Sequence, residues 1–192
     1  MSQQTEEQTI NVGVIGAGGR MGRMLIEAVQ DNPQTTLNAA IERQGSSLVG
    51  ADAGEVAAIG RLEVQIVDDL KAVINDIDVL IDFSLPDATE QNMQICAANK
   101  VAMVIGTTGF NEQQEQVLKE ASKKIAIVYA GNYSTGVNLS LKLLAMAAKA
   151  FGNDADVEVI EAHHKHKIDA PSGTAYMMAE AVAEARGQNL KD

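Results

Sequence analysis

Short apolar segments alternate with longer segments of helical periodicity over residues 10–129. Strands that are buried on both faces are almost continuously apolar, whereas amphipathic helices repeat apolar residues every three or four positions. This alternation is typical of βα units that build a doubly wound parallel sheet. Six strands are predicted, at residues 10–15, 37–41, 63–67, 78–83, 101–105 and 125–129.

Helix start signals occupy the segments between these strands. Apolar residues from Met21 onward recur at helical spacing, and Asn111 with Gln114 three residues later is typical of a capping box. Asp68 and Pro86 are also residue types that are favoured at helix starts. Further helices are therefore predicted at residues 69–74, at residues 87–98 and after Asn111, whereas residues 45–60, with no period and many small residues, are predicted to form a long loop.

The pattern changes after the sixth strand. A long helix is predicted at residues 136–151, followed by a strand at 157–162, a polar and basic loop, and a helix at 174–186. We interpret residues 1–133 as one domain and residues 134–192 as the first part of a second, α+β domain. Because a single strand has no partner for its backbone groups, we expect this second domain to be incomplete in the chain.

Charge and composition exclude several classes of partner. The 192 residues include 15 Lys and Arg against 26 Asp and Glu, which gives a formal net charge of -11. A field of this sign repels nucleic acid and anionic membranes. The longest aliphatic run, residues 143–148, is far shorter than the ~20 residues that span a bilayer. The single cysteine, Cys96, is interpreted as a small buried thiol, and we expect a cytoplasmic protein.

A glycine-rich turn follows the first strand. Residues 16–22 read Gly-Ala-Gly-Gly-Arg-Met-Gly, and glycines in this place let backbone N–H groups approach a pyrophosphate at the helix start. The last glycine comes one residue later than in the strict fingerprint, and a glycine turn without a ligand has the same local geometry. The fingerprint also predicts an acid about 20 residues later, where Glu42 lies (42 minus 22 is 20). We therefore predict a Rossmann-type dinucleotide site.

Glu42 and its neighbour Arg43 bear on the choice of cofactor. A carboxylate here accepts hydrogen bonds from the adenosine ribose hydroxyls, which favours NAD. A guanidinium pairs with a 2′-phosphate or stacks on adenine, which favours NADP. The pair predicts tolerance of both NADH and NADPH; the alternative is a solvated turn at a strand end.

Two later strand ends carry unusual turns. The first reads Gly106-Thr107-Thr108-Gly109 and the second reads Ala130-Gly131-Asn132-Tyr133. Ligands of open α/β sheets bind at the carboxyl ends of the strands, so these turns are candidate walls for the nicotinamide. Simple polar turns around glycine are the alternative.

All three histidines fall within four positions. His163, His164 and His166 alternate with Lys165 and Lys167, so a local positive site exists against the sign of the overall charge. An anionic small molecule suits such a site. A metal site, a solvated charge run and structural histidines are the alternatives. A metal ion is not expected, because the lysines repel a cation and Cys96 lies far away in the sequence.

A predicted helix start directly follows this cluster. Residues 171–174 read Pro-Ser-Gly-Thr and precede the helix, whose free N–H groups and positive end suit a carboxylate. The His-Lys cluster and this helix start lie in one loop and both favour anions, which together predict a dicarboxylate ligand.

The motifs together resemble the 4-hydroxy-tetrahydrodipicolinate reductase family, formerly dihydrodipicolinate reductase. The resemblance rests on residues 16–22, the Glu42-Arg43 pair, residues 106–109 and above all residues 163–175. It implies a bacterial, cytoplasmic enzyme of the diaminopimelate route to lysine, which reduces a cyclic dicarboxylate with NADH or NADPH to tetrahydrodipicolinate and water. It also implies a homotetramer built by the sheet of the substrate domain. Family members are longer than this chain, so its assembly and activity are open at this point.

The resemblance also implies roles for individual residues. His163 matches the family's proton donor and acceptor, and Lys167 matches its second proton donor. His164, Gly173 and Thr174 match substrate contacts. The cofactor contacts map to Gly16, Ala17, Gly18, Gly19, Arg20, Met21, Glu42, Arg43, Gly106, Thr107, Thr108, Ala130, Gly131, Asn132 and Tyr133.

Two other functions compete with this prediction. Another NAD(P)-dependent dehydrogenase, such as a semialdehyde or homoserine dehydrogenase, would share the nucleotide half but leaves the His-Lys cluster unexplained. A nucleotide-sensing module would bind NADH without turnover.

Overall fold

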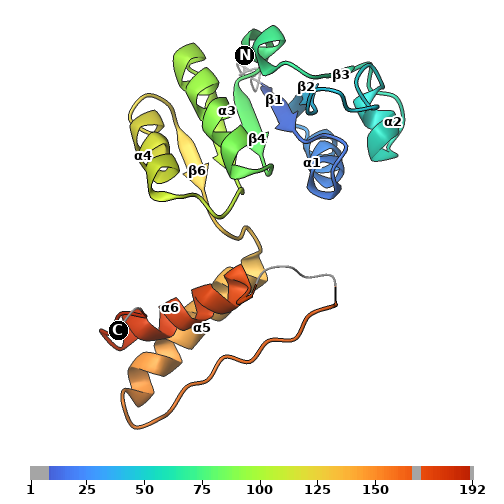
Figure 1. Ribbon diagram of the computed structural model, residues 1–192. Helices are drawn as coiled ribbons and strands as arrows, with labels where there is room; N and C mark the ends of the chain where they lie inside the picture. The colour runs from blue at the N-terminus through green and yellow to red at the C-terminus, as the bar shows by residue number, and fades with distance from the viewer. Residues whose placement is uncertain (1–8, 166–169, 191–192) are drawn as a thin grey trace, which may run out of the picture. The chain divides into compact units, whose positions relative to one another are not determined.

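The computed structural model describes residues 9–165 and 170–190, which form two compact units (Figure 1). The first unit comprises residues 1–130 and the second comprises residues 131–192. Among the described helices, none is both long and apolar enough to cross a membrane.

The first unit is built on a parallel six-stranded sheet with the order β3-β2-β1-β4-β5-β6. The chain runs outward from β1 to β3 and then returns to the other side of β1, so the direction of winding reverses between β1 and β4. Such a reversal leaves a crevice at the carboxyl ends of the strands. The predicted doubly wound sheet is confirmed, with strands β1 (Ile10–Ile15), β2 (Thr35–Ile41), β3 (Ile66–Val67), β4 (Val79–Asp82), β5 (Ala102–Ile105) and β6 (Ile127–Tyr129).

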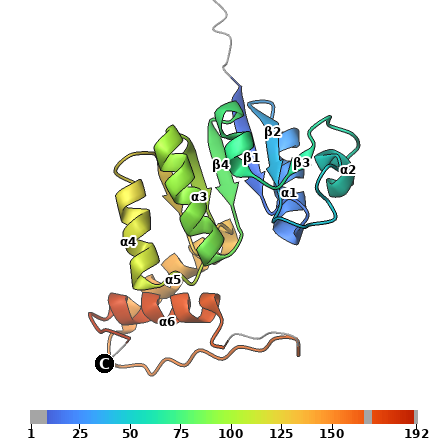
Figure 2. The same cartoon turned by 45° about the horizontal axis from the view of Figure 1, so that its top comes forward.

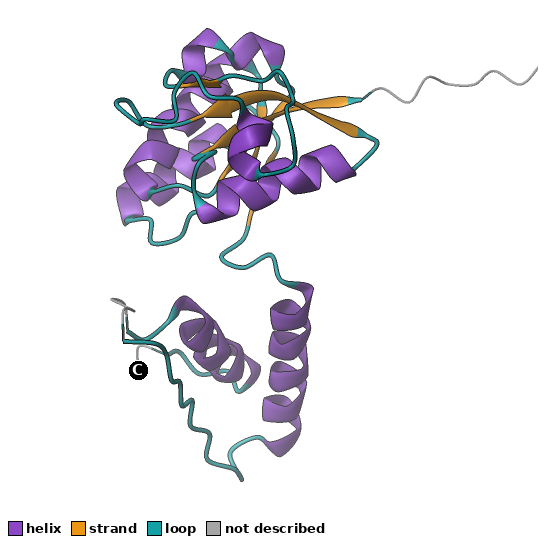
Figure 3. Ribbon diagram, turned by 90° about the vertical axis from the view of Figure 1, so that its right-hand side faces the viewer, coloured by secondary structure: helices purple, strands orange, loops and turns teal. Residues whose placement is uncertain are grey.

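Helices pack on both faces of this sheet (Figures 2 and 3). One core contains buried residues of β1 and β2 packed against α1 (Arg20–Asp31), including Val14 and Ile26. The other contains buried residues of β4 and β5 packed against α3 (Pro86–Asn99) and α4 (Glu112–Ala121), including Leu80 and Met93. Burial on both faces explains why these strands are almost continuously apolar.

The helix starts follow local chemistry. Asn111 and Gln114 form the predicted capping box, with Gln114 N donating to Asn111 Oδ1 at 2.9 Å and Asn111 N donating to Gln114 Oε1 at 3.1 Å. Pro86 occupies the first turn of α3, where its missing N–H is not needed. Cys96 is fully buried in α3, and burial, with a smaller effect of the Asp82 charge, raises its pKa to about 12. The interpretation of Cys96 as a small buried thiol is confirmed.

The predicted loop at residues 45–60 is wrong in part, because it contains the short helix α2 (Ala53–Ala57). Asp52 Oδ1 accepts hydrogen bonds from the N–H groups of Gly54 and Glu55, which starts the helix. The same oxygen accepts from Leu62 N at 3.0 Å, a contact that the local periodicity does not contain.

Two elements after this loop are shorter than predicted. The third strand is reduced to β3 (Ile66–Val67), and Glu63 has a φ of 61°, which no strand residue adopts. The predicted helix at residues 69–74 is instead two 3₁₀ turns, η1 (Leu70–Ala72) and η2 (Ile74–Asp76). Asp69 caps η1, and Val73 interrupts the helical conformation between the two turns.

The second unit contains α5 (Thr135–Phe151) and α6 (Gly173–Ala185), which pack against each other. The predicted strand at residues 157–162 is wrong for the described structure, where this segment pairs with no strand. A strand needs a neighbour to bond its N–H and C=O groups, and the described part of this unit supplies none. Arg186 Nη2, at the end of α6, donates to Ala155 O at 2.7 Å, just before this segment.

Candidate active site

The glycine-rich turn joins the carboxyl end of β1 to α1. Gly16 has a φ of 71°, a conformation that favours glycine, and a Cβ at Gly22 would overlap the Gly16 carbonyl oxygen. The close approach of helix and turn therefore depends on Gly22, although its spacing departs from the strict fingerprint. Gly19 precedes α1 without a side-chain cap, and the first turn carries no acidic residue. This helix start presents N–H groups and positive potential to an anion.

Glu42 follows β2 and reaches the glycine turn. Its Oε1 accepts a hydrogen bond from Gly18 N at 2.8 Å, and its Oε2 accepts one from Arg43 N at 3.2 Å. The structure thus brings together Gly18 and the acid that the fingerprint predicts 20 residues after Gly22. A Cβ at position 18 would overlap the terminal methyl of Leu48 and approach Glu42, so a larger residue requires the Leu48 side chain to move.

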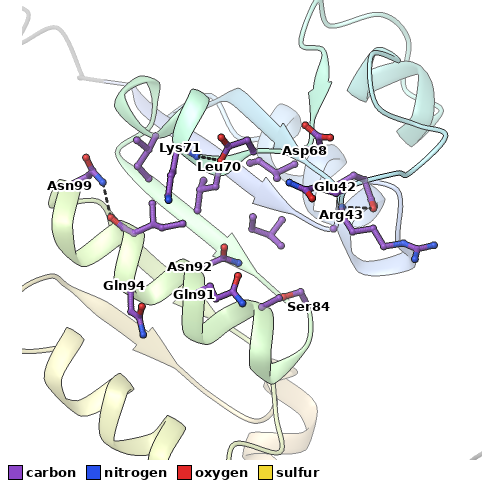
Figure 4. A pocket seen from close by; sticks show the side chains of 18 of the residues that line it. Glu42, Arg43, Asp68, Leu70, Lys71, Ser84, Gln91, Asn92, Gln94 and Asn99 are labelled. Carbon is purple, nitrogen blue, oxygen red and sulfur yellow. Dashed lines mark hydrogen bonds between the residues drawn. The ribbon is translucent and has the colours of Figure 1, made fainter.

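A cavity of about 1050 Å³ opens beside this contact (Figure 4). It lies at the carboxyl ends of β1 and β2, with Gly16, Glu42 and Arg43 on one side. Side chains of α3, among them Asn92, line another side. This is the place where an open α/β sheet binds its ligand.

Sequence reasoning did not include several residues that line this cavity, among them Asp68, Lys71, Ser84 and Asn92. Ser84 follows a strand end in the same way as residues 106–109, so the carboxyl-end argument applied to β4 would have found it. Lys71 belongs to η1, inside the segment predicted as a helix, and local periodicity does not show that this segment borders the cavity.

The turn after β5 is joined to the end of β4. Gly106 N donates to Asp82 O at 2.9 Å, and a Cβ at Gly106 would overlap the Phe83 ring. Thr107 is buried, whereas the Thr108 side chain is exposed. The end of β6 continues the series, because Ala130 N donates to Ile105 O at 3.3 Å.

Gly131, Asn132 and Tyr133 belong to the second unit. Asn132 has a local role there, since its Oδ1 accepts from Ser134 N at 2.8 Å and its carbonyl accepts from Asn138 Nδ2 at 2.9 Å. These bonds shape the entry to α5.

Glu161 joins the histidine segment to α6. Its Oε2 lies 2.8 Å from His163 Nε2, and its Oε1 accepts a hydrogen bond from Ser172 N at 2.8 Å. Hydrogen bonds from Ser172, with a smaller contribution from His163, lower the pKa of Glu161 to about 2. The acceptor is therefore a carboxylate, and a hydrogen bond to it places a hydrogen on Nε2 of His163.

The start of α6 is joined to Glu161 through Ser172. Ser172 caps the helix, its Oγ accepting from Ala175 N at 3.1 Å. Gly173 and Thr174 form the first turn, and a Cβ at Gly173 would meet open space. His164 is exposed, and Lys167 lies outside the described residues.

Within residues 9–165 and 170–190, no group of three His, Cys, Asp or Glu side chains is arranged to hold a metal ion. His166, the second histidine of the His-x-x-His spacing, lies outside that part of the chain.

Comparisons with known proteins agree with these features. The family model described as dihydrodipicolinate reductase, N-terminus, matches residues 10–133, and the model of its C-terminus matches residues 136–192. A 4-hydroxy-tetrahydrodipicolinate reductase of Psychrobacter arcticus (strain DSM 17307 / VKM B-2377 / 273-4) is 89% identical over 192 residues, which cover 100% of this chain and 69% of the relative. One of Acinetobacter baylyi (strain ATCC 33305 / BD413 / ADP1) is 58% identical over 180 residues, which cover 94% of this chain and 66% of that relative.

A solved structure is also similar. The dipicolinate-bound dihydrodipicolinate reductase from Paenisporosarcina sp. TG-14 has a TM-score of 0.74 and 32% sequence identity, covering 93% of this chain and 67% of that chain. The chain thus spans about two thirds of the length of these relatives. Family models that match nearly the whole chain confirm the predicted resemblance, and this chain belongs to the dihydrodipicolinate reductase family.

Proposed function

We propose that this chain acts as a 4-hydroxy-tetrahydrodipicolinate reductase, which uses NADH or NADPH to form tetrahydrodipicolinate and water. The observation that carries the proposal is the contact between Gly18 and Glu42 beside a cavity, in a chain 89% identical to a reductase of that name. A homotetramer in the cytoplasm is part of the same proposal and follows from the family resemblance.

The glycine turn fits a dinucleotide. The first turn of α1 has no side-chain cap, so its N–H groups can bind the pyrophosphate. A Cβ at Gly22 would overlap the Gly16 carbonyl, so this glycine lets the start of α1 approach the turn closely, and Gly18 adds no side chain beside the backbone that the phosphate would approach. Residues Gly16, Ala17, Gly18, Gly19, Arg20 and Met21 form this cradle.

Glu42 and Arg43 hold the adenosine end. Glu42 accepts from the ribose hydroxyls, and its present bond to Gly18 N keeps the carboxylate at the turn. Arg43 supplies a cation for the 2′-phosphate of NADPH. The nicotinamide side is bound by the backbone of the turn Gly106, Thr107 and Thr108 and by the turn Ala130, Gly131, Asn132 and Tyr133.

A bound reduced nicotinamide would supply a hydride to the substrate ring, and the ring hydroxyl leaves as water together with a ring hydrogen. His163 delivers the proton that balances this hydride, through Nδ1, because Glu161 holds the hydrogen on Nε2. Glu161 also stabilises the protonated imidazole with its negative charge. Lys167 is the second proton donor of this proposal.

The substrate carboxylates bind near the start of α6. His164, Gly173 and Thr174 contact them, with the helix N–H groups and positive end contributing. Glu161 joins both functions, since one of its oxygens holds His163 and the other holds Ser172 at the helix start. The dipicolinate-bound structure of a relative supports a small dicarboxylate as the ligand.

Titration with pyridine-2,6-dicarboxylate separates a reductase from a nucleotide sensor, which has no reason to bind it. We expect the NADH-loaded chain to bind this dicarboxylate in a calorimetric titration. Thr174→Val removes a hydroxyl from the start of α6 and should weaken binding, whereas Ser140→Ala, which removes an exposed hydroxyl from α5, is the matched control and should not. NADH binding without dicarboxylate binding would favour the sensor.

A further inference from the structure

Asp82 carries a carboxylate buried at the carboxyl end of β4. Its side chain is 0% exposed, and among the described residues its hydrogen-bond partners are all neutral. Ser84 donates to Oδ1 from both its backbone N at 2.9 Å and its Oγ at 2.6 Å. Asn92 Nδ2 donates to Oδ2 at 2.8 Å. A buried charge destabilises the fold unless it is hydrogen-bonded, so the Asp82 carboxylate depends on the bonds from Ser84 and Asn92.

The same carboxylate reaches the next strand end. Thr107 Oγ1 lies 3.5 Å from Asp82 Oδ1, and Thr89 Oγ1 lies 2.8 Å from Thr107 Oγ1. Thr89 is fully buried in α3 and Thr107 is 3% exposed, so neither hydroxyl is available to a ligand. The turn after β5 is therefore bonded to both β4 and α3.

Backbone and packing contacts strengthen this link. Gly106 N donates to the Asp82 carbonyl at 2.9 Å, and the Phe83 ring occupies the space that a side chain at Gly106 would need. Asp82 thus contacts the turn after β5 through its side chain and its backbone. The turns at the ends of β4 and β5 are therefore joined by these hydrogen bonds and packing contacts.

We propose that Asp82 is a positioning residue that fixes the 106–108 turn for the nicotinamide end of the cofactor. The inference rests on the proposed function, which assigns that turn to the nicotinamide. Asp82 itself touches no cofactor, because it is fully buried. Asp82 acts on the turn through its contacts with the Thr107 hydroxyl and the Gly106 N–H.

The position of the network predicts which part of the cofactor it affects. Glu42 and Arg43 hold the adenosine end after β2, on the far side of β1 from β4 and β5. Loosening the 106–108 turn should weaken contacts to the nicotinamide and leave those to ADP-ribose unchanged. A general loss of structure would weaken both ligands together.

The test compares NADH with ADP-ribose, which lacks the nicotinamide, by fluorescence and calorimetric titration of the full 192-residue chain. Asp82→Asn, which removes the charge that Ser84 and Asn92 bond, should weaken NADH binding by about tenfold, with ADP-ribose affinity changed by less than about twofold. Thr89→Val removes the bond to Thr107 with little change of volume and should act in the same direction. Thr89→Ser keeps the hydroxyl and should restore NADH binding.

Asp78→Asn is the matched control, since Asp78 precedes β4 and bonds Asn11 N at the opposite end of the strand. It should leave both affinities unchanged. If Asp82→Asn fails to fold, the Thr89→Val and Thr89→Ser pair gives the answer.

Two results overturn the inference in different ways. Equal loss of NADH and ADP-ribose affinity in Thr89→Val, or no loss of either, contradicts the positioning role and leaves the proposed function intact. Failure of the unaltered chain to bind either ligand contradicts the proposed nucleotide site itself, and the inference fails with it.

Discussion

The Glu42 carboxylate accepts a hydrogen bond from the Gly18 N–H at 2.8 Å, across 24 residues of sequence. This bond connects the glycine turn after β1 to the end of β2, which are the two places where a dinucleotide-binding sheet holds pyrophosphate and ribose. A carboxylate accepts hydrogen bonds from backbone N–H groups and repels a second anion, so the proposed site makes Glu42 a candidate for selecting between NADH and NADPH.

Changing Glu42 should therefore shift the balance between the two cofactors. Glu42→Ala removes the ribose acceptor and should weaken NADH binding by about 10-fold or more, because hydrogen bonds to charged groups contribute about 1.5–3 kcal/mol. NADPH should lose less, since repulsion of its 2′-phosphate disappears at the same time. Glu42→Gln keeps an oxygen for Gly18 N and serves as the control. Equal losses of NADH and NADPH in calorimetric titrations would remove Glu42 from cofactor selection.

Arg43 is expected to act on NADPH alone. Arg43→Ala should weaken NADPH binding and leave NADH within about twofold, because only the 2′-phosphate gains from the guanidinium. Arg43→Lys keeps the charge but not the planar guanidinium, so its NADPH affinity should lie between those of the unaltered chain and Arg43→Ala. If both cofactors lose affinity alike, Arg43 stacks on the adenine instead.

Gly22 is predicted to be essential to the packing of α1. Gly22→Ala places a Cβ against the Gly16 carbonyl, which the backbone of the turn cannot avoid without moving. We expect a loss of about 1–3 kcal/mol in the free energy of unfolding, together with weaker NADH binding. Met24→Ala on the same helix is the control, since Met24 is 62% exposed and should change stability by less than about 0.5 kcal/mol. An unaltered urea midpoint in Gly22→Ala would contradict the close approach.

The predictable part of the fold is the part set by local pattern. The apolar strands between Ile10 and Tyr129 predict a buried parallel sheet. Asn111 and Gln114, three residues apart, predict the start of α4. The family and the glycine turn were also predicted, because their motifs are contiguous in the sequence.

The elements that sequence reasoning missed depend on contacts between distant residues. Asp52 starts α2 while also bonding Leu62, and the bond to Leu62 is invisible in a local window. The network of Asp82 and Thr107 spans 25 residues, so no motif could show it. The predicted strand at 157–162 failed for the converse reason, since its pattern is locally sound but a strand also requires a partner.

The pH dependence of the second unit should reflect Glu161. Its pKa falls from 4.5 to about 2, mainly because Ser172 hydrogen-bonds the charged form. A group with a lowered folded pKa stabilises the fold fully above pH 4.5, and this contribution is lost as the pH falls toward about 2. The protection factors of the α6 amides, which correct hydrogen exchange for the pH dependence of its intrinsic rate, should therefore fall over this range.

Glu161→Gln should flatten that acid dependence, because the amide still accepts from Ser172 N but does not titrate. Glu180→Gln, an exposed position on the same helix, is the control and should keep it. If Glu161→Gln and the unaltered chain respond identically to acid, the bonds of Glu161 to Ser172 and His163 do not stabilise the unit.

Hydride transfer from NADH to a cyclic dicarboxylate, with His163 as the proton donor, is the reaction proposed for this chain. The most direct test follows NADH oxidation by this chain with enzymatically generated 4-hydroxy-tetrahydrodipicolinate, beside the reductase of Psychrobacter arcticus as the positive control. We expect substrate-dependent oxidation by both proteins, and a fall in kcat of ~10²- to 10⁴-fold in His163→Gln with NADH affinity little changed. Turnover by the relative alone, or a His163→Gln chain within a few-fold of the unaltered rate, would contradict it.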